Sequence, residues 1–218
     1  MIGRRGFLLG LAATPVATVC EGQAGLRCYM ETTLRRNAAY RNECAGVRLK
    51  DVARNQIGVT TSYDPAYISL DYPNGDFDRS SGVCTDVIIR AYRDAFKFDL
   101  QEAIHEDMRD NFADYPSIWG LSQPDKNIDH RRVPNIETFL ERGGYELPTD
   151  EWARGDLITC RVGNLPHIGI VSGSRTRISE MGGGGFPKVI HNIGRGTREE
   201  SVIGLYNNER RFRFLPAA

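Results

Sequence analysis

Apolar residues recur at helical spacing in the N-terminal half of the chain and at alternate positions further on. The helical spacing predicts amphipathic helices over residues 47–57, 84–96, 100–112 and 134–143. Gly58 and Gly143 stand where two of these helices should end, and Pro134 stands in a first turn. We therefore expect a layer of helices before the first long strand begins.

After Trp152 the apolar period changes to two, which predicts strands over residues 157–162, 167–172 and 188–193. Residues 182–185 are all glycine and predict a flexible connection between the last two strands. Residues 202–205 and 211–215 are candidates for edge strands. Helices followed by an antiparallel sheet predict an α+β fold with the N-terminal helices packed on the sheet.

The first 24 residues have the pattern of an export signal. Arg4 and Arg5 precede an apolar stretch that is too short to cross a bilayer, and the pair resembles a twin-arginine signal. Two alternatives are a hydrophobic N-terminal core helix and a lipoprotein signal that uses Cys20. We expect the mature protein in the periplasm or cell envelope, without a spanning segment. It should have an extension at residues 25–46 and one domain at residues 47–218.

The composition is that of an ordinary globular protein, with 40% hydrophobic and 26% charged residues. Lys plus Arg and Asp plus Glu number 28 each among 218 residues. This balance provides no basic surplus for a nucleic-acid partner, so we expect none.

Four cysteines remain after residue 24, namely Cys28, Cys44, Cys84 and Cys160. An oxidising compartment permits disulfides, and Cys28 and Cys44 are the natural pair because they flank a short segment. Such a loop would stabilise the fold by about 3 kcal/mol. Cys160 has the surroundings of a buried strand residue.

Cys84 follows a Ser-Ser-Gly-Val loop and begins a predicted helix. The free N–H groups and positive dipole end of a helix N-terminus favour a thiolate, the form that attacks carbonyl carbon. His167 and His191 lie on neighbouring predicted strands, so His167 can serve as a base and His191 can orient its ring. Asn192 alternates to the other face, which favours His191 for that role. The alternative is that these are ordinary core residues.

Five segments resemble the NlpC/P60 papain-like cysteine peptidases and, more closely, the exported bacterial DUF1287 family assigned to that superfamily. They cover most of residues 47–196. The Asn-Ile-Asp-His-Arg-Arg run from residue 127 is the most distinctive part. The segments are residues 63–67 (Tyr-Asp-Pro-Ala-Tyr), 82–91 (Gly-Val-Cys-Thr-Asp-Val-Ile-Ile-Arg-Ala), 125–135 (Asp-Lys-Asn-Ile-Asp-His-Arg-Arg-Val-Pro-Asn), 167–172 (His-Ile-Gly-Ile-Val-Ser) and 191–194 (His-Asn-Ile-Gly).

The resemblance implies a papain-like fold with Cys84 as nucleophile, His167 as base and His191 as the third polar residue. It also implies a substrate class, because members of the wider superfamily cut peptide or amide bonds in bacterial cell-wall peptides. We expect neither a metal nor a cofactor. Two other functions stay open: a non-catalytic module that binds the cell wall or a partner, and a metal-dependent amidase that uses His130, His167 and His191.

Six further residues are candidates for substrate binding. Arg131 or Arg132 can grip a carboxylate of a wall peptide in a bidentate manner, although ion pairs within a loop are an equally good explanation. Asp86 can help to order the site, although capping of its helix is its ordinary role. The full set is Tyr63, Tyr67, Asp86, His130, Arg131 and Arg132.

Overall fold

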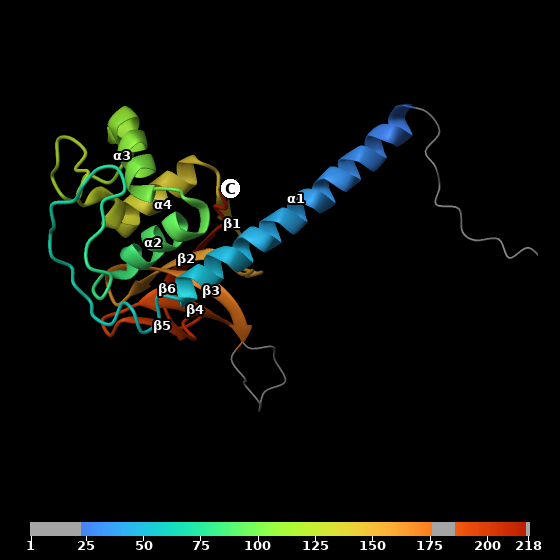
Figure 1. Ribbon diagram of the computed structural model, residues 1–218. Helices are drawn as coiled ribbons and strands as arrows, with labels where there is room; N and C mark the ends of the chain where they lie inside the picture. The colour runs from blue at the N-terminus through green and yellow to red at the C-terminus, as the bar shows by residue number, and fades with distance from the viewer. Residues whose placement is uncertain (1–22, 176–185, 217–218) are drawn as a thin grey trace, which may run out of the picture. The chain divides into compact units, whose positions relative to one another are not determined.

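The computed structural model describes residues 23–175 and 186–216 (Figure 1). The predicted export signal and the glycine run at 182–185 lie almost entirely outside these residues. The helices are α1 (Gln23–Arg54), α2 (Cys84–Phe96), α3 (Leu100–Asn111) and α4 (Val133–Arg142), with short 3₁₀ turns η1 (Phe112–Asp114) and η2 (Asp129–Arg131). The strands are β1 (Glu146–Leu147), β2 (Leu157–Val162), β3 (Leu165–Arg175), β4 (Pro187–Asn192), β5 (Thr197–Glu200) and β6 (Asn207–Phe212).

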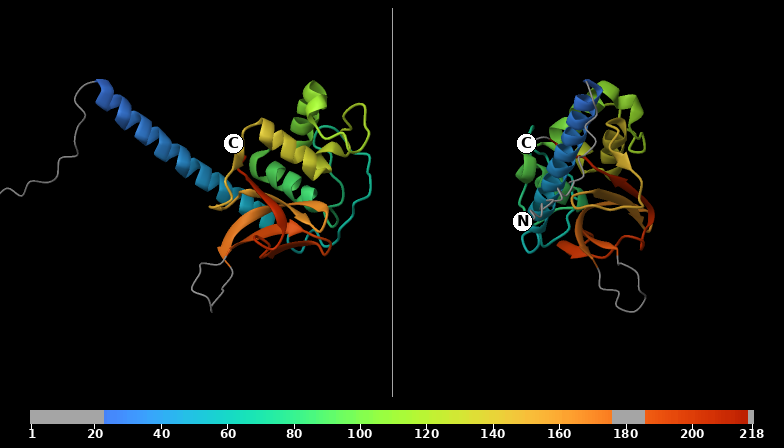
Figure 2. Two further views of the ribbon diagram at one scale, coloured as in Figure 1. Left: turned by 180° about the vertical axis from the view of Figure 1, so that it is seen from behind. Right: turned by 90° about the vertical axis from the view of Figure 1, so that its right-hand side faces the viewer.

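The predicted α+β class is confirmed, with helices and a six-stranded antiparallel sheet in the order β1-β6-β2-β3-β4-β5. Backbone contacts divide the chain into residues 1–41 and residues 42–218, and the second unit holds the whole sheet. Within that unit α2, α3 and α4 form one layer and the sheet forms the other (Figures 1 and 2). None of the described helices is long and apolar enough to cross a membrane.

Three expectations about elements were wrong. The edge strand expected at residues 211–215 is β6, which ends at Phe212 and lies between β1 and β2. The helix expected at residues 47–57 is the end of the much longer α1. Residues 202–205 form turns rather than an edge strand. Val202 and Ile203 are adjacent, and both are buried in the apolar cluster on one face of the sheet, so they lack the alternation of a strand. The strand in this region is β5, which the sequence did not reveal because Thr-Arg-Glu-Glu has no apolar alternation.

The alternation along β3 assigns its residues to two different faces. Ile168 and Ile170 belong to the main core with α2, whereas Val171 packs with Val189 in a second cluster on the other face. His167 and Gly169 share the side of Val171, because side chains alternate along a strand. His167 is the third residue of β3, so its side chain leaves the sheet near the end at which the strand begins.

Helix α2 is the centre of the core. Eleven of its thirteen residues are buried, including Val87, Ile88 and Tyr92 with no exposed surface. The Tyr92 hydroxyl donates to the Phe214 carbonyl at 2.7 Å, and the two rings stack with centroids 5.7 Å apart. A helix buried on so many sides has a fixed position, which matters because Cys84 is its first residue.

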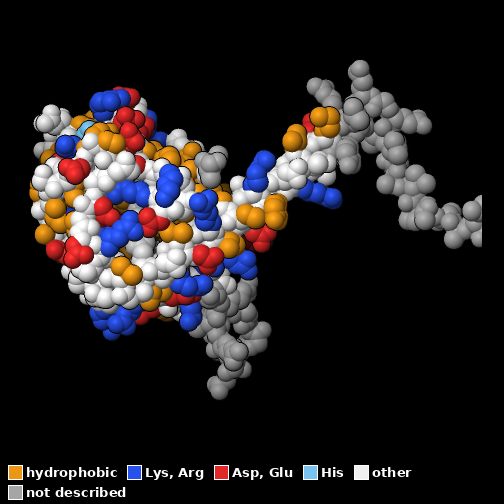
Figure 3. All heavy atoms as spheres, viewed as in Figure 1, with side chains coloured by type: hydrophobic (Ala, Val, Ile, Leu, Met, Phe, Trp, Pro, Cys, Tyr) orange, Lys and Arg blue, Asp and Glu red, His pale blue; other side chains and the backbone are white. Residues whose placement is uncertain are grey.

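Charged residues of both signs are interspersed over the face of residues 42–218 that Figure 3 shows, in keeping with their equal numbers. One carboxylate is fully buried: Asp156, just before β2, accepts from Arg211 Nε at 2.7 Å and Arg213 Nε at 2.7 Å. It also accepts from the Ala153 N–H at 2.8 Å. This cluster ties the start of β2 to the last strand.

We predict that Asp156→Asn lowers the free energy of unfolding by about 3 kcal/mol, because it leaves the buried Arg211 guanidinium without its counter-charge. Glu146→Gln is the matched control, since Glu146 also pairs with an arginine of β6 but is exposed. The control should change stability by less than about 1 kcal/mol. Urea unfolding measures both, and equal midpoints for the two variants would contradict the assignment.

Candidate active site

Cys84 is held at the first position of α2 by a tight turn. Val83 before it has an extended backbone, and its N–H donates to the Asp86 carboxylate at 2.7 Å. A Cβ at Gly82 would lie 3.0 Å from Arg90 Nη1 and 3.1 Å from the Asp86 Cβ. A side chain at Gly82 would therefore crowd Asp86 and Arg90 in this turn.

The thiol of Cys84 lies against the backbone of β3. The backbone N–H groups of Ile168 and Thr85 favour the thiolate, and 4% of the residue is exposed. Burial nevertheless raises the pKa of the thiol to about 11, and the nearby Asp86 carboxylate acts in the same direction. The expected thiolate is wrong for the free protein, because desolvation outweighs the N–H donors of the helix N-terminus.

His167 and His191 form the hydrogen bond that their strand positions suggested. His167 Nε2 lies 2.8 Å from His191 Nδ1, and the rings meet edge to face with centroids 5.0 Å apart. The pairing of Ile170 with Ile190 continues to place Gly169 opposite His191, so the two histidines are diagonal neighbours. A Cβ at Gly169 would lie 3.2 Å from the His191 Cβ and 2.3 Å from Val189 Cγ1. Glycine is needed there for the two strands to carry this pair.

Glu200 of β5 is in turn a diagonal neighbour of His191. His191 Nε2 faces Glu200 Oε2 at 3.4 Å, an ion-pair distance that is long for a hydrogen bond. The sequence analysis missed Glu200 because it missed β5. We call His167, His191 and Glu200 the histidine relay.

The hydrogen bond between the rings fits either of two tautomer pairs. In one of them His191 carries its proton on Nε2, facing the Glu200 carboxylate, and accepts at Nδ1. His167 then donates from Nε2, and its Nδ1 is the unprotonated nitrogen. Burial lowers the pKa of His167 to about 3 and lowers the pKa of His191. Both rings are therefore neutral at pH 7, and His167 Nδ1 is a free base in this tautomer pair.

Asn192, next to His191 on β4, fastens the loop that carries Cys84. Its Nδ2 donates to the Gly82 carbonyl at 2.8 Å and to the Ser62 carbonyl at 3.0 Å. Asn192 has no exposed surface. Adjacent residues of one strand thus orient the imidazole of His167 and hold the loop of the thiol.

Comparison with known proteins assigns the family. A family model described as "Domain of unknown function (DUF1287)" matches residues 50–214. The chain belongs to the DUF1287 family. It is also 50% identical over 160 residues to "Uncharacterized protein YijF" of Escherichia coli (strain K12), which covers 71% of this chain and 75% of that protein.

In this DUF1287 protein Arg131 is paired within the protein. Its guanidinium pairs with both Asp86 oxygens at 3.0 Å and donates to the carbonyls of Ala66 at 2.9 Å and Asp64 at 3.1 Å. The residue is buried. These contacts match the alternative of ion pairs within a loop, and Asp86 orders the turn before Cys84.

His130 and Arg132 are also placed elsewhere than expected. His130 is buried, and desolvation together with the nearby Arg93 lowers its pKa to about 3. The expected binding role would therefore require His130 to become accessible. Arg132 lies over the Trp119 ring in a separate pocket.

The two tyrosines of residues 63–67 have different surroundings. Burial and the nearby Cys84 and Asp86 raise the pKa of Tyr63 to about 12. Tyr63 is 40% exposed, so it can contact a ligand. Tyr67 donates to Asp125 at 3.0 Å and accepts from Asn127 Nδ2 at 2.9 Å. Tyr63 is the substrate-binding candidate that the structure brings to Cys84.

The expected Cys28–Cys44 disulfide is wrong, because Cys44 has a free, exposed thiol. Both positions belong to one continuous helix, in which 16 residues rise by about 24 Å. Cys160 and Cys84 are free as well. Among the described residues, no group of three His, Cys, Asp or Glu side chains is arranged to hold a metal ion.

We predict that Cys84 reacts slowly with iodoacetamide at pH 6 and that its rate rises with each pH unit up to pH 10. Only the thiolate reacts, and a pKa of about 11 keeps its fraction small throughout this range. The exposed Cys44 is the internal reference and should react at least about 10-fold faster at pH 7.5. Peptide mapping by mass spectrometry separates the two sites. A Cys84 rate that is already maximal at pH 6 would instead indicate a thiolate paired with a protonated histidine.

Proposed function

We propose that this protein is an exported cysteine hydrolase with a papain-like fold of the NlpC/P60 type. In this proposal it cleaves peptide or amide bonds in peptidoglycan stem peptides. The observation that carries it is the histidine relay, in which His167 Nε2 lies 2.8 Å from His191 Nδ1 at the start of the strand whose Ile168 packs with Cys84. A lone structural cysteine has no need of such an arrangement.

The reaction begins from a neutral thiol and a neutral imidazole. The proposal requires His167 Nδ1 to reach the thiol at the end of β3 when a substrate is bound. As the Cys84 sulfur attacks the carbonyl carbon, its proton then passes to that nitrogen. The imidazolium that forms is stabilised by His191, and the Glu200 carboxylate compensates the new charge from behind. His167 then gives the proton to the leaving amine, and a thioester remains on Cys84.

Water completes the cycle. His167 Nδ1 removes a proton from a water molecule as the oxygen attacks the thioester, and the acid product leaves with Cys84 restored as a thiol. Backbone N–H groups at the start of α2 are the available donors for the oxyanion. The high thiol pKa suits this order, because proton transfer and attack occur together only once a substrate is bound.

Two further observations support the substrate class. The resemblance of residues 63–67, 82–91 and 167–172 to NlpC/P60 peptidases links the site to cell-wall peptides. The expected export signal would deliver the protein to that substrate in the periplasm or cell envelope. The resemblance and the export signal add to what the geometry of the site supports.

One observation favours a second candidate, a non-catalytic module on the same fold that binds the cell wall or a partner. Cys84 is almost wholly buried, and a buried neutral thiol is the ordinary state of a structural cysteine. The presence or absence of cleavage distinguishes the two functions directly.

We expect the purified protein to release new muropeptides from peptidoglycan, as measured by mass spectrometry of the soluble products. Cys84→Ala and His167→Ala should each reduce the rate by at least about 1,000-fold, because they remove the nucleophile and the base. Glu200→Gln should give a smaller loss, since it changes only the far end of the relay.

Cys160→Ala is the matched control. Cys160 is a buried thiol directly opposite His167 in β2, yet it has no role in the proposed reaction. The control should retain activity. Equal digestion by wild type and a folded Cys84→Ala variant would reject the hydrolase, and binding of peptidoglycan without cleavage by either protein would favour the second candidate.

A further inference from the structure

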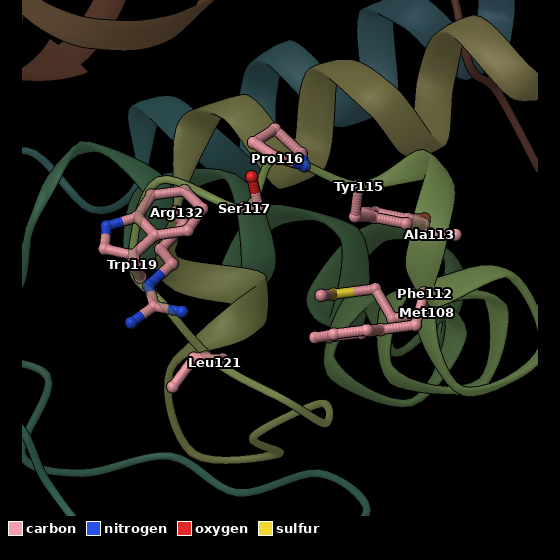
Figure 4. Close-up of a pocket in the computed structure, with 9 residues that line it drawn as sticks. All are labelled: Met108, Phe112, Ala113, Tyr115, Pro116, Ser117, Trp119, Leu121 and Arg132. Carbon is pink, nitrogen blue, oxygen red and sulfur yellow. The ribbon is translucent and has the colours of Figure 1, made fainter.

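A small pocket beyond the histidine relay has the features of a binding site. It holds about 120 Å³ and is lined mainly by apolar side chains at the end of α3, in η1 and in the loop that follows (Figure 4). Met108 and Phe112 form one side, and Trp119 and Arg132 form the other. A protein cavity of about 150 Å³ holds one benzene ring, so this pocket matches a single ring or a branched aliphatic group.

Arg132 gives the pocket its polarity. Its guanidinium lies 4.2 Å from the centre of the Trp119 ring, so the indole face fixes its plane. Nη1 donates to Asp129 at 3.1 Å. Within residues 23–175 and 186–216, Nε and Nη2 of Arg132 have no hydrogen-bond partner. The side chain is 16% exposed, so these donors can be reached from solvent. A guanidinium with free donors at the mouth of an apolar pocket suits a carboxylate.

The surrounding charges leave Arg132 as the group that selects the ligand. Asp129 is buried behind Arg132 and also accepts the N–H of Asp125, so its negative charge is already shared. Arg142 forms salt bridges with Asp107 and Asp114 and is therefore already paired. Leu121 closes the rim as an exposed apolar residue.

We propose that this pocket binds an apolar carboxylic acid, with the apolar group between Phe112 and Trp119 and the carboxylate on Arg132. The ligand has one ring or one branched aliphatic group within a few bonds of the carboxylate. A free organic acid and the C-terminus of a peptide with an apolar last residue share this chemistry. The site is independent of the hydrolase proposal, because none of its residues belongs to the relay.

Trp119 reports on its own pocket. The chain has two tryptophans, and Trp152 packs in the cluster on the other face of the sheet. A Trp152→Phe protein therefore keeps one tryptophan, Trp119, and its fluorescence reports on the proposed site. The free-acid probe is 3-phenylpropionate and the peptide probe is N-acetyl-Ala-Phe, each compared with its neutral amide.

The acids should change the Trp119 emission in a saturable manner with a dissociation constant on the order of 1 mM, as expected for ligands of this size. The amides should bind at least about 10-fold more weakly, because they lose the charge-assisted bonds to Arg132. Tighter binding of the peptide acid would identify a peptide C-terminus as the source, and tighter binding of 3-phenylpropionate would identify a free acid.

Arg132→Gln should weaken the acids by a similar factor. Because Arg132 also precedes α4 and pairs with Asp129, Leu121→Asp is the second variant, placing a repelling charge at the exposed rim. Arg109→Gln is the control on the same helix layer, since Arg109 is exposed and pairs only with its neighbour Asp110. An unchanged Trp119 emission with every probe, or equal affinity for acid and amide, would overturn the proposal.

Discussion

The bidentate pair between Asp86 and Arg131 is the interaction on which the candidate site depends. Asp86 also accepts the N–H of Val83, so the same carboxylate caps α2 and fixes the turn that carries Cys84. Arg131 extends the pair to the carbonyls of Asp64 and Ala66, which brings the segment with Tyr63 beside the thiol. Both charges are buried, so removing either would leave the other uncompensated at a cost of about 3–5 kcal/mol.

This arrangement explains why the similar segments are spread along the chain. The segment at residues 125–135 supplies Arg131, the segment at 82–91 supplies Asp86, and the segment at 63–67 supplies the carbonyls. None of these contacts is needed for the chemistry itself. They determine where Cys84 stands, while β3 and β4 determine where His167 and His191 stand.

The site combines a rigid frame with a neutral resting state. Cys84 and His167 are both largely buried, and burial moves the pKa of the thiol up and the pKa of the imidazole down. An ion pair between them is therefore unfavourable before a substrate arrives. In the proposed reaction, the Glu200 carboxylate would compensate the charge that His167 gains with a proton. In this account the histidine relay stabilises the charge that forms during the reaction and not a charge that is present at rest.

Periodicity was enough to predict α2, α3, β2 and the α+β class, because those elements bury regular faces. It also placed His167 and His191 on adjacent strands, and their hydrogen bond follows from the diagonal geometry around Gly169. Periodicity does not show which charged side chains pair with each other. The sequence alone does not distinguish Arg131 from an arginine that binds substrate. Its salt bridge with Asp86 is visible only in the tertiary fold.

Three other differences arise where packing or strand pairing decides against the local sequence pattern. A helix N-terminus favours a thiolate, yet the packing of Cys84 against Ile168 removes the water that an anion needs. Glu200 was missed because β5 is a polar strand held by its pairing with β4, which no local pattern records. The length of α1 likewise exceeds what its apolar spacing predicts.

The central claim, that His167 makes Cys84 a nucleophile, is tested most directly by trapping the acyl-enzyme. The protein is mixed with a peptidoglycan stem peptide, quenched in acid within the first turnover and measured by intact mass spectrometry with peptide mapping. The account predicts a thioester on Cys84 in the wild-type protein and in Cys160→Ala, and none in His167→Ala. Products formed without an adduct on Cys84 in any of these proteins, or an adduct that forms equally fast in His167→Ala, would contradict it.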